Sequence, residues 1–367
     1  MKKHLKWLTE ITAIPTAAGQ EWRIVAWIEN WAKKQYGIVL KKDKYGNLLL
    51  TQSRKSSKKP IYITAHLDHP AFVVRRQIDE QHLEMEFRGG VNDQYFVGAK
   101  IEVFDDNDNT YFGTIESLEA KAKPFKRVVA KLQKSVAGYL LEGDIARWRF
   151  KPPTIKGDLF HAPACDDLAG VAAAISALDK IKSLPTLGHV GVLLTRAEEI
   201  GFVGAIAAAK NKSVPKSSRL LCLETSRSFP ESPIGGGPIL RVGDKTSVFG
   251  PELTNAITEI MNTQKKFLWQ RKLMPGGTCE STAFCSYGYL STCLCLALGN
   301  YHNMHDIDGV LQKNKPAKVA PEIISVNDYH GLVKMLTVIC RELDKPRPAT
   351  LHRGLEKRLK NYRRILS

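Results

Sequence analysis

Short apolar segments that are typical of buried strands alternate with helical segments over most of this chain. Residues 190–194, 220–223 and 290–298 are apolar runs of this kind, and helical patterns at 204–210 and 251–261 separate them, with another at 168–178 before the first. Strands that alternate with helices predict a mostly parallel sheet with helices on both faces. We therefore expect an α/β fold in which ligands bind beyond the carboxyl ends of the central strands.

The pattern changes between residues 72 and 156. Short runs there alternate apolar and polar residues, and clusters of Gly, Asp and Asn such as 105–109 separate them. This pattern predicts antiparallel strands joined by turns, and hence an inserted all-β domain. Residues 321–343 are expected to close the α/β domain as a helix. The predicted organisation is an α/β domain at residues 1–71 and 157–345, a β domain at 72–156 and a basic helix or tail at 346–367.

Acidic residues and histidines follow several of the predicted strands. They are His66 with Asp68, Asp166 with Asp167, Glu198 with Glu199, Glu224, and His302. Each motif alone has an ordinary explanation, such as a surface ion pair or acids that cap a helix. Together they would meet at one edge of one sheet, and imidazole and carboxylate groups are the ligands that Zn²⁺-like ions take. The ordered set therefore predicts a pair of metal ions and metal-assisted hydrolysis.

The spacing within these motifs suggests which residues bind metal, which support a ligand and which transfer a proton. Residues two apart on an extended segment point the same way, so Asp68 is expected to contact and support the ring of His66. One of two adjacent glutamates can bind metal while its neighbour handles the proton. Two histidines, His302 and His305, follow the last predicted strand, and the residues alone allow either of them as a ligand.

Composition limits the compartment and the partners. The seven cysteines are an odd number without a C-x-x-C pair, which indicates a reducing cytoplasm and not a disulfide framework. No run approaches 18 apolar residues, so we expect neither a membrane span nor a membrane partner. The net charge of +17 could attract nucleic acid, anionic membrane or acidic peptides. No nucleic-acid motif accompanies the charge, so we expect a solvated basic surface and no nucleic-acid partner.

The order of the motifs resembles that of the tetrahedral, or deblocking (glutamyl), aminopeptidases, a family of the wider clan of co-catalytic zinc peptidases. The similarity extends over nearly the whole chain. It includes five further segments, at residues 14–21, 43–48, 97–101, 235–238 and 275–278.

This resemblance implies a ligand set, and we expect two divalent ions, with zinc favoured and cobalt or manganese as alternatives. The implied ligands are His66, Asp166, Glu199, Glu224 and His302. Asp166 would bridge the ions, Glu198 would be the general base and Asp68 would orient His66. His302 is preferred over His305 because the family pattern places a Tyr-His pair before a short turn and an acid. The resemblance also implies a peptide substrate and a homo-oligomer assembled through the β insert.

We therefore predict a metal-dependent aminopeptidase that removes N-terminal residues through a water held by both metals, with Glu198 as the base. Glu224 leaves an alternative open. Aminopeptidases of the wider clan usually carry Asp at this position, whereas carboxypeptidases and N-acyl-amino-acid deacylases carry Glu. Two rivals from other classes are a binding protein that kept the fold and lost catalysis, and a nucleic-acid-binding protein that uses the basic clusters.

Overall fold

The computed structural model describes residues 2–54, 56–136, 140–346 and 350–366. An eight-stranded sheet forms its centre, in the order β1-β2-β12-β3-β13-β16-β14-β15. The four inner strands run parallel; they are β12 (Val190–Thr195), β3 (Ile61–His66), β13 (Arg219–Arg227) and β16 (Leu290–Leu298). The outer strands are β1 (Ile38–Lys42), β2 (Leu48–Gln52), β14 (Ile239–Gly243) and β15 (Gln270–Leu273).

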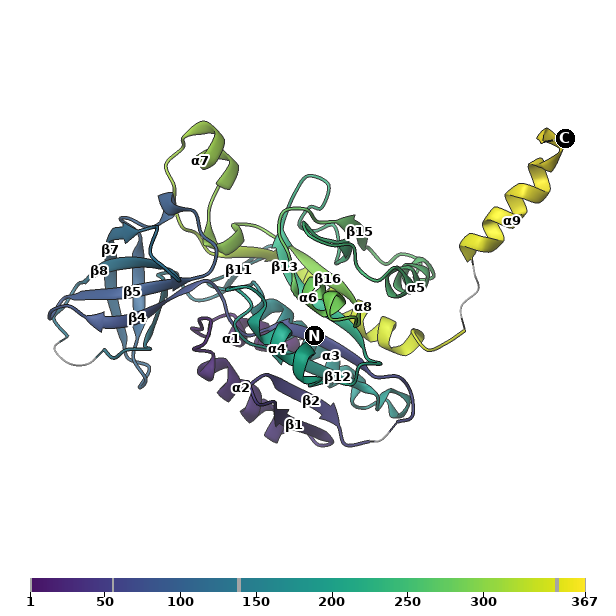
Figure 1. Cartoon of the computed structure of the whole chain (residues 1–367), viewed down its shortest axis with the longest axis horizontal. Coiled ribbons are helices and arrows are strands. Elements are labelled where there is room, and N and C mark those ends of the chain that lie inside the picture. The colour runs from purple at the N-terminus through teal and green to yellow at the C-terminus, as the bar shows by residue number, and fades with distance from the viewer. Residues whose placement is uncertain (1, 55, 137–139, 347–349, 367) are drawn as a thin grey trace.

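Helices cover both faces of this sheet (Figure 1). One face packs against α1 (Lys2–Ile11), α2 (Trp22–Lys33), α3 (Leu168–Ile181), α5 (Pro251–Asn262) and α8 (Val326–Glu342). The other face packs against α4 (Val203–Asn211) and α6 (Glu280–Ser286). Both β3 and β12 are buried at every position, as expected for strands enclosed on two sides. The predicted mixed α/β fold is confirmed.

Six strands close into a barrel to one side of the sheet (Figure 1). They are β4 (Ala71–Gln77), β5 (His82–Arg88), β6 (Lys100–Phe104), β7 (Thr110–Glu119), β8 (Lys126–Leu132) and β9 (Ile145–Trp148). The barrel has its own core, in which Phe72, Phe87, Phe96 and Trp148 make edge-to-face contacts. Strand β5 alternates buried and half-buried residues, which is the period-2 pattern of its sequence.

The prediction of one helix over residues 321–343 is wrong at its start. Glu322–Ser325 forms β17, which pairs with β11 (Leu159–Ala162), and α8 begins only at Val326. Two adjacent isoleucines favour the strand, and the hydroxyl of Ser325 then accepts a hydrogen bond from the Asp328 N–H, which caps the helix.

The remaining elements are short or terminal. They are β10 (Thr154–Lys156), α7 (Ile307–Lys313), α9 (Thr350–Tyr362) and the 3₁₀ turns η1 (Asp93–Tyr95), η2 (Pro185–Leu187), η3 (Tyr301–Asn303) and η4 (Arg363–Ile365). Among the helices of the described residues, none has the length and apolarity needed to cross a membrane.

Candidate active site

The carboxyl ends of the inner strands bring the predicted acids and histidines together. His66 is the last residue of β3, and Glu198 and Glu199 lie in the loop after β12. Asp166 precedes α3, and His302 lies in η3, directly after β16.

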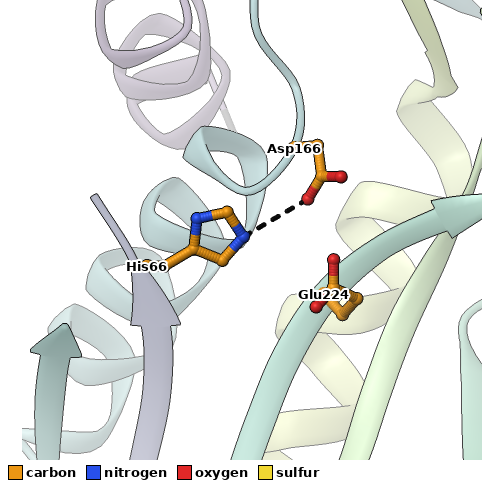
Figure 2. A group of neighbouring side chains, drawn as sticks. All are labelled: His66, Asp166 and Glu224. Atoms are coloured by element: carbon orange, nitrogen blue, oxygen red, sulfur yellow. Dashed lines mark ion pairs between the residues drawn. The ribbon is translucent and has the colours of Figure 1, made fainter. Parts of the chain in front are cut away.

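Glu224 comes from β13 and faces the same space as His66 and Asp166 (Figure 2). The apolar run at 220–223 predicted a strand that ends at Leu223, which is wrong, because β13 continues to Arg227. The polar residues after Glu224 keep pairing with the buried strand β16.

Asp166 lies between the two histidines. Its Oδ1 is 3.4 Å from His66 Nε2, and its Oδ2 is 3.4 Å from His302 Nε2. Glu199 Oε2 is 3.5 Å from His302 Nε2, and Glu198 Oε2 is 3.9 Å from His66 Nε2. Candidate ligand atoms fall into three groups, and the atoms of each group lie within 4.8 Å of one another. The groups are His66, Asp166 and Glu224; His66, Glu198 and Glu199; and Asp166, Glu199 and His302.

Burial and crowding of like charges shift the pKa values of these groups. Burial, followed by the neighbouring carboxylates, raises the pKa of Glu198, Glu199 and Glu224 well above the usual range. Burial opposes ionisation of Asp166 too, but its contacts with the two histidines outweigh burial and lower its pKa. A set of buried acids of this kind ionises only when a positive charge compensates it.

Three buried ligand atoms at the centre have no hydrogen-bond partner among the described residues. They are His66 Nε2, Glu199 Oε1 and Glu224 Oε2. Buried polar atoms are normally satisfied, so a group of unpaired lone pairs converging on one space needs an explanation. Divalent cations supply it, because nitrogen and oxygen donors in this mixture suit Zn²⁺-like ions. The residues present therefore fit a metal centre.

Asp68 acts mainly on the loop that carries the two glutamates. Its Oδ1 accepts a hydrogen bond from the Glu198 N–H at 2.9 Å, and its Oδ2 accepts one from the Glu199 N–H at 3.0 Å. The ring of His66 contacts Asp68 as well. Its Nδ1 is 3.1 Å from the main-chain carbonyl of Asp68 and 3.5 Å from Oδ1. The expected contact with His66 is present, but the shorter one uses the carbonyl.

Glu21 also supports the loop that carries Glu198 and Glu199, although no sequence pattern pointed to this residue. Its Oε1 accepts a hydrogen bond from the Ala197 N–H at 3.0 Å, and its Oε2 accepts one from Arg196 Nε at 2.8 Å. Two carboxylates thus bind three successive N–H groups of the loop, at 197, 198 and 199. Ala197 has a φ of 53°, a conformation that is strained for a residue with a side chain, so the loop needs this support.

Glu322 is a second residue that was missed. Its Oε1 accepts from the His302 N–H at 2.9 Å, and its Oε2 accepts from the N–H groups of Cys165 and Asp166 at 2.6 and 2.9 Å. One buried carboxylate therefore joins the segments that carry Asp166 and His302. It escaped detection because residues 321–343 were read as a helix.

The two candidate histidines lie in different surroundings. His302 is buried, and its Nδ1 donates to the carbonyl of Gly90 at 2.6 Å, which leaves Nε2 to face Asp166 and Glu199. His305 is exposed, and its Nδ1 lies 3.2 Å from Asn300 Oδ1. The centre thus receives His302 and not His305.

Two further buried acids border the centre without belonging to any of its ligand groups. Asp167 Oδ1 is 3.3 Å from Thr225 Oγ1, and its Oδ2 has no hydrogen-bond partner among the described residues. Burial raises the pKa of Glu280, which lies at the start of α6, to about 7.

A pocket opens beside Glu224 and Tyr301. It is lined by Ser226, Arg227, Phe229, Arg241, Met274 and residues 276–278 as well. Arg241 is almost completely buried, and its guanidinium donates to Ser226 Oγ at 3.0 Å and to the Gly277 carbonyl at 2.7 Å. The pocket therefore combines an acidic edge with a fixed positive charge and apolar walls.

Known proteins resemble this chain in sequence and in fold. A curated protein of Acetivibrio thermocellus, whose name assigns it as an aminopeptidase, is 25% identical over 232 residues, which are 60% of this chain and 68% of that protein. The TET aminopeptidase of Thaumarchaeota archaeon SCGC AB-539-E09 has a similar structure, with a TM-score of 0.77, 17% identity and coverage of 94% of this chain and 98% of that one. For the TET1 peptidase of Pyrococcus horikoshii the TM-score is 0.75, with 19% identity and coverage of 92% and 99%.

The similarity to these structures shows only the fold, whereas a match to a family model shows the family of the chain. The model described as M42 glutamyl aminopeptidase matches residues 46–315. Because that match spans most of its length, the chain belongs to the M42 glutamyl aminopeptidase family and is a hydrolytic enzyme of the peptidase class.

Proposed function

We propose that this protein is an aminopeptidase that removes N-terminal residues from peptides with the help of two divalent ions, zinc being favoured. His66, Asp166, Glu199, Glu224 and His302 would hold the ions, with Asp166 shared between them. The observation that carries the proposal is the place of Asp166 between His66 and His302, each 3.4 Å from a different carboxylate oxygen. The unpaired ligand atoms around it support the same assignment.

The ions supply polarisation of the scissile carbonyl and a lowered pKa for water. Glu198 is the general base, which accepts a proton from the attacking water and passes it to the leaving amine. Its pKa is raised by burial and by neighbouring acids, which suits a group that must both accept and release a proton near neutral pH. Asp68 orients His66 and, through its bonds to the Glu198 and Glu199 N–H groups, holds the base in place.

The pocket beside Glu224 receives the N-terminal side chain of the substrate. Glu224 supplies negative charge near the free amine, while Arg241, together with Arg227, which pairs with Asp308, favours an acidic side chain in the same pocket. The same arginines would also suit a substrate carboxylate, so a carboxypeptidase or N-acyl-amino-acid deacylase remains the alternative.

A substrate panel separates these two functions. We expect the purified protein with zinc, cobalt or manganese to release nitroaniline from glutamyl and aspartyl substrates faster than from leucyl ones. N-acetylated versions of the same substrates should be left intact, because they lack the free amine. Cleavage of only the acetylated or carboxy-terminal substrates would contradict the aminopeptidase proposal and favour the alternative. Metal analysis of the same preparation tests the two-ion stoichiometry.

The quaternary structure and the barrel form a separate part of the proposal. The TET1 peptidase of Pyrococcus horikoshii can assemble into a tetrahedron or a large octahedral shell. We infer that this chain also forms a homo-oligomer, with the six-stranded barrel as an inserted domain that contributes to the contacts. Light scattering of the intact protein measures the assembly size.

Glu21→Gln is expected to lower kcat by about ten- to a hundredfold with little change in KM. The amide cannot keep the charged bonds to Arg196 and to the Ala197 N–H, so the loop that carries Glu198 shifts. Steady-state kinetics measures kcat and KM. Metal content and thermal unfolding show whether the metal centre and the fold are intact.

Glu29→Gln is the matched control for this variant. Glu29 lies on α2, the helix that directly follows Glu21, and pairs at the surface with Lys42. Its substitution should leave kcat unchanged. Equal kcat values for the Glu21 and Glu29 variants would show that Glu21 does not position the base.

A further inference from the structure

The C-terminal helix α9 exposes an apolar face that no other described residue covers. Leu351, Leu355 and Leu359 recur every four residues and are between 52% and 72% exposed. Tyr362, the last residue of α9, lies on the same side and is also exposed. Residues at this spacing share one face of a helix. In Figure 1, α9 stands away from the rest of the chain.

The opposite face of α9 is basic. Arg353 and Lys357 each lie two residues after a leucine, and Lys360 follows Lys357 by about one turn, which places these three on the far side from the leucines. Arg358 borders the leucine row. Residues 346–367 contain seven Lys and Arg but a single acidic residue, Glu356. A helix with leucine and tyrosine on one side and lysine and arginine on the other is typical of segments that lie in the plane of a membrane surface.

The charge of the molecule opposes two other partners for this face. The chain as a whole carries 54 basic and 37 acidic residues, so a second copy or the body of the same copy presents a surplus of like charge. The 13 residues of α9 are also fewer than the three heptads that a coiled coil requires. Nucleic acid would neutralise the basic face but leave the leucine face in water.

We propose that α9 docks this enzyme on anionic lipid bilayers, with the leucine face at the acyl boundary and the basic face among the headgroups. A helix of this length is marginal in water without a packing partner, and burial of its apolar face in the lipid stabilises it. Each Lys or Arg near an anionic surface strengthens binding by about fivefold. The expectation of no membrane partner rested on the lack of a spanning segment, and surface attachment requires none.

Co-sedimentation of the full-length protein with vesicles tests the proposal. One set of vesicles is phosphatidylcholine alone, and the other contains about one third phosphatidylglycerol. We expect the protein to sediment with the anionic vesicles and not with the neutral ones. Binding should weaken as the salt concentration rises, because salt screens the attraction between the basic face and the lipid.

Two double variants separate the faces of the helix. Leu355→Gln with Leu359→Gln should weaken vesicle binding by about tenfold or more, because less apolar surface enters the lipid. Lys357→Gln with Lys360→Gln should weaken it by a similar factor.

The matched control is Leu273→Gln with Leu311→Gln. These leucines, in β15 and α7, are exposed to a similar degree but lie outside α9. They should leave vesicle binding unchanged, and peptidase activity measured in parallel reports whether each variant is folded.

Three results would overturn the proposal. The first is the absence of sedimentation with anionic vesicles at low salt. The second is unchanged vesicle binding by the variant with Leu355→Gln and Leu359→Gln. That result would show that binding depends on charge alone and not on the leucine face. The third is loss of self-association or of duplex DNA binding in that variant, with no vesicle binding by the parent protein. That result would assign the face to a second copy or to nucleic acid.

Discussion

Glu198→Gln is expected to lower kcat by about 10²- to 10⁴-fold while the fold and the metal content stay intact. The substitution keeps the shape of a buried side chain that lies 3.9 Å from His66 Nε2, so packing changes little. An amide cannot accept the proton of the attacking water, so the loss falls on turnover and not on substrate binding. Steady-state kinetics, elemental analysis and far-UV circular dichroism of the same sample measure these quantities.

The neighbouring variant, Glu199→Gln, is the matched comparison. Glu199 Oε2 lies 3.5 Å from His302 Nε2, and its Oε1 has no hydrogen-bond partner among the described residues, which is the environment of a ligand. We expect this variant to lose metal content together with activity. A Glu198→Gln protein that turned over substrate at the parent rate would remove Glu198 from the role of base. Equal metal loss in both variants would instead make Glu198 a ligand.

Asp166→Asn is expected to weaken metal binding by at least about a hundredfold and to abolish activity. Each carboxylate oxygen of Asp166 lies 3.4 Å from a different histidine, so this side chain can serve both halves of the centre. In the parent protein, addition of zinc should raise the midpoint of thermal unfolding, because ligand binding to the folded state stabilises it. In the variant, that midpoint should no longer respond to zinc.

Proton release gives a second measure of metal binding in the parent protein, with which the Asp166→Asn variant can be compared. Burial raises the pKa values of Glu198, Glu199 and Glu224, so before a cation enters these groups keep their protons to higher pH than free glutamates do. Metal binding should therefore release protons, and calorimetry in two buffers of different ionisation enthalpy measures their number. The number released should fall as pH rises through the raised pKa values, because the groups are then already ionised before the metal binds.

Asp167→Asn is the control, because Asp167 is equally buried and adjacent in the chain but belongs to none of the ligand groups. It should keep its metal. A metal-replete, active Asp166→Asn protein would exclude the bridging assignment.

Local sequence patterns were enough to predict most of the elements around the site. The inner strands appear where continuous apolar runs stood, because a strand enclosed on both faces has no polar positions. His66, Glu198 and His302 were found by the same reasoning, since each stands at the end of such a run. Asp166 instead follows β11, a strand of the small sheet that has both exposed and buried residues. The alternating residues of β5 likewise predicted a strand with one inward face.

The errors arose where local signals conflicted or were weak. The isoleucines of β17 were assigned to the following helix, and the predicted strand at 220–223 left out the polar end of β13. In both cases the partner strand decides the structure. Glu322 pairs with Ala162 across the small sheet, and Thr225 pairs with Leu296 in the central one.

The sequence by itself determined the alternation of strands and helices, the chemical types of the ligands and their order along the chain, because these depend on neighbours a few residues apart. Only the tertiary structure decided which carboxylates hold the ligands in place. Glu21 meets Ala197 across 176 residues, and Glu322 meets Asp166 across 156. Contacts over such separations leave no local periodicity, since they arise when the strands of the sheet assemble and carry distant loops to one edge.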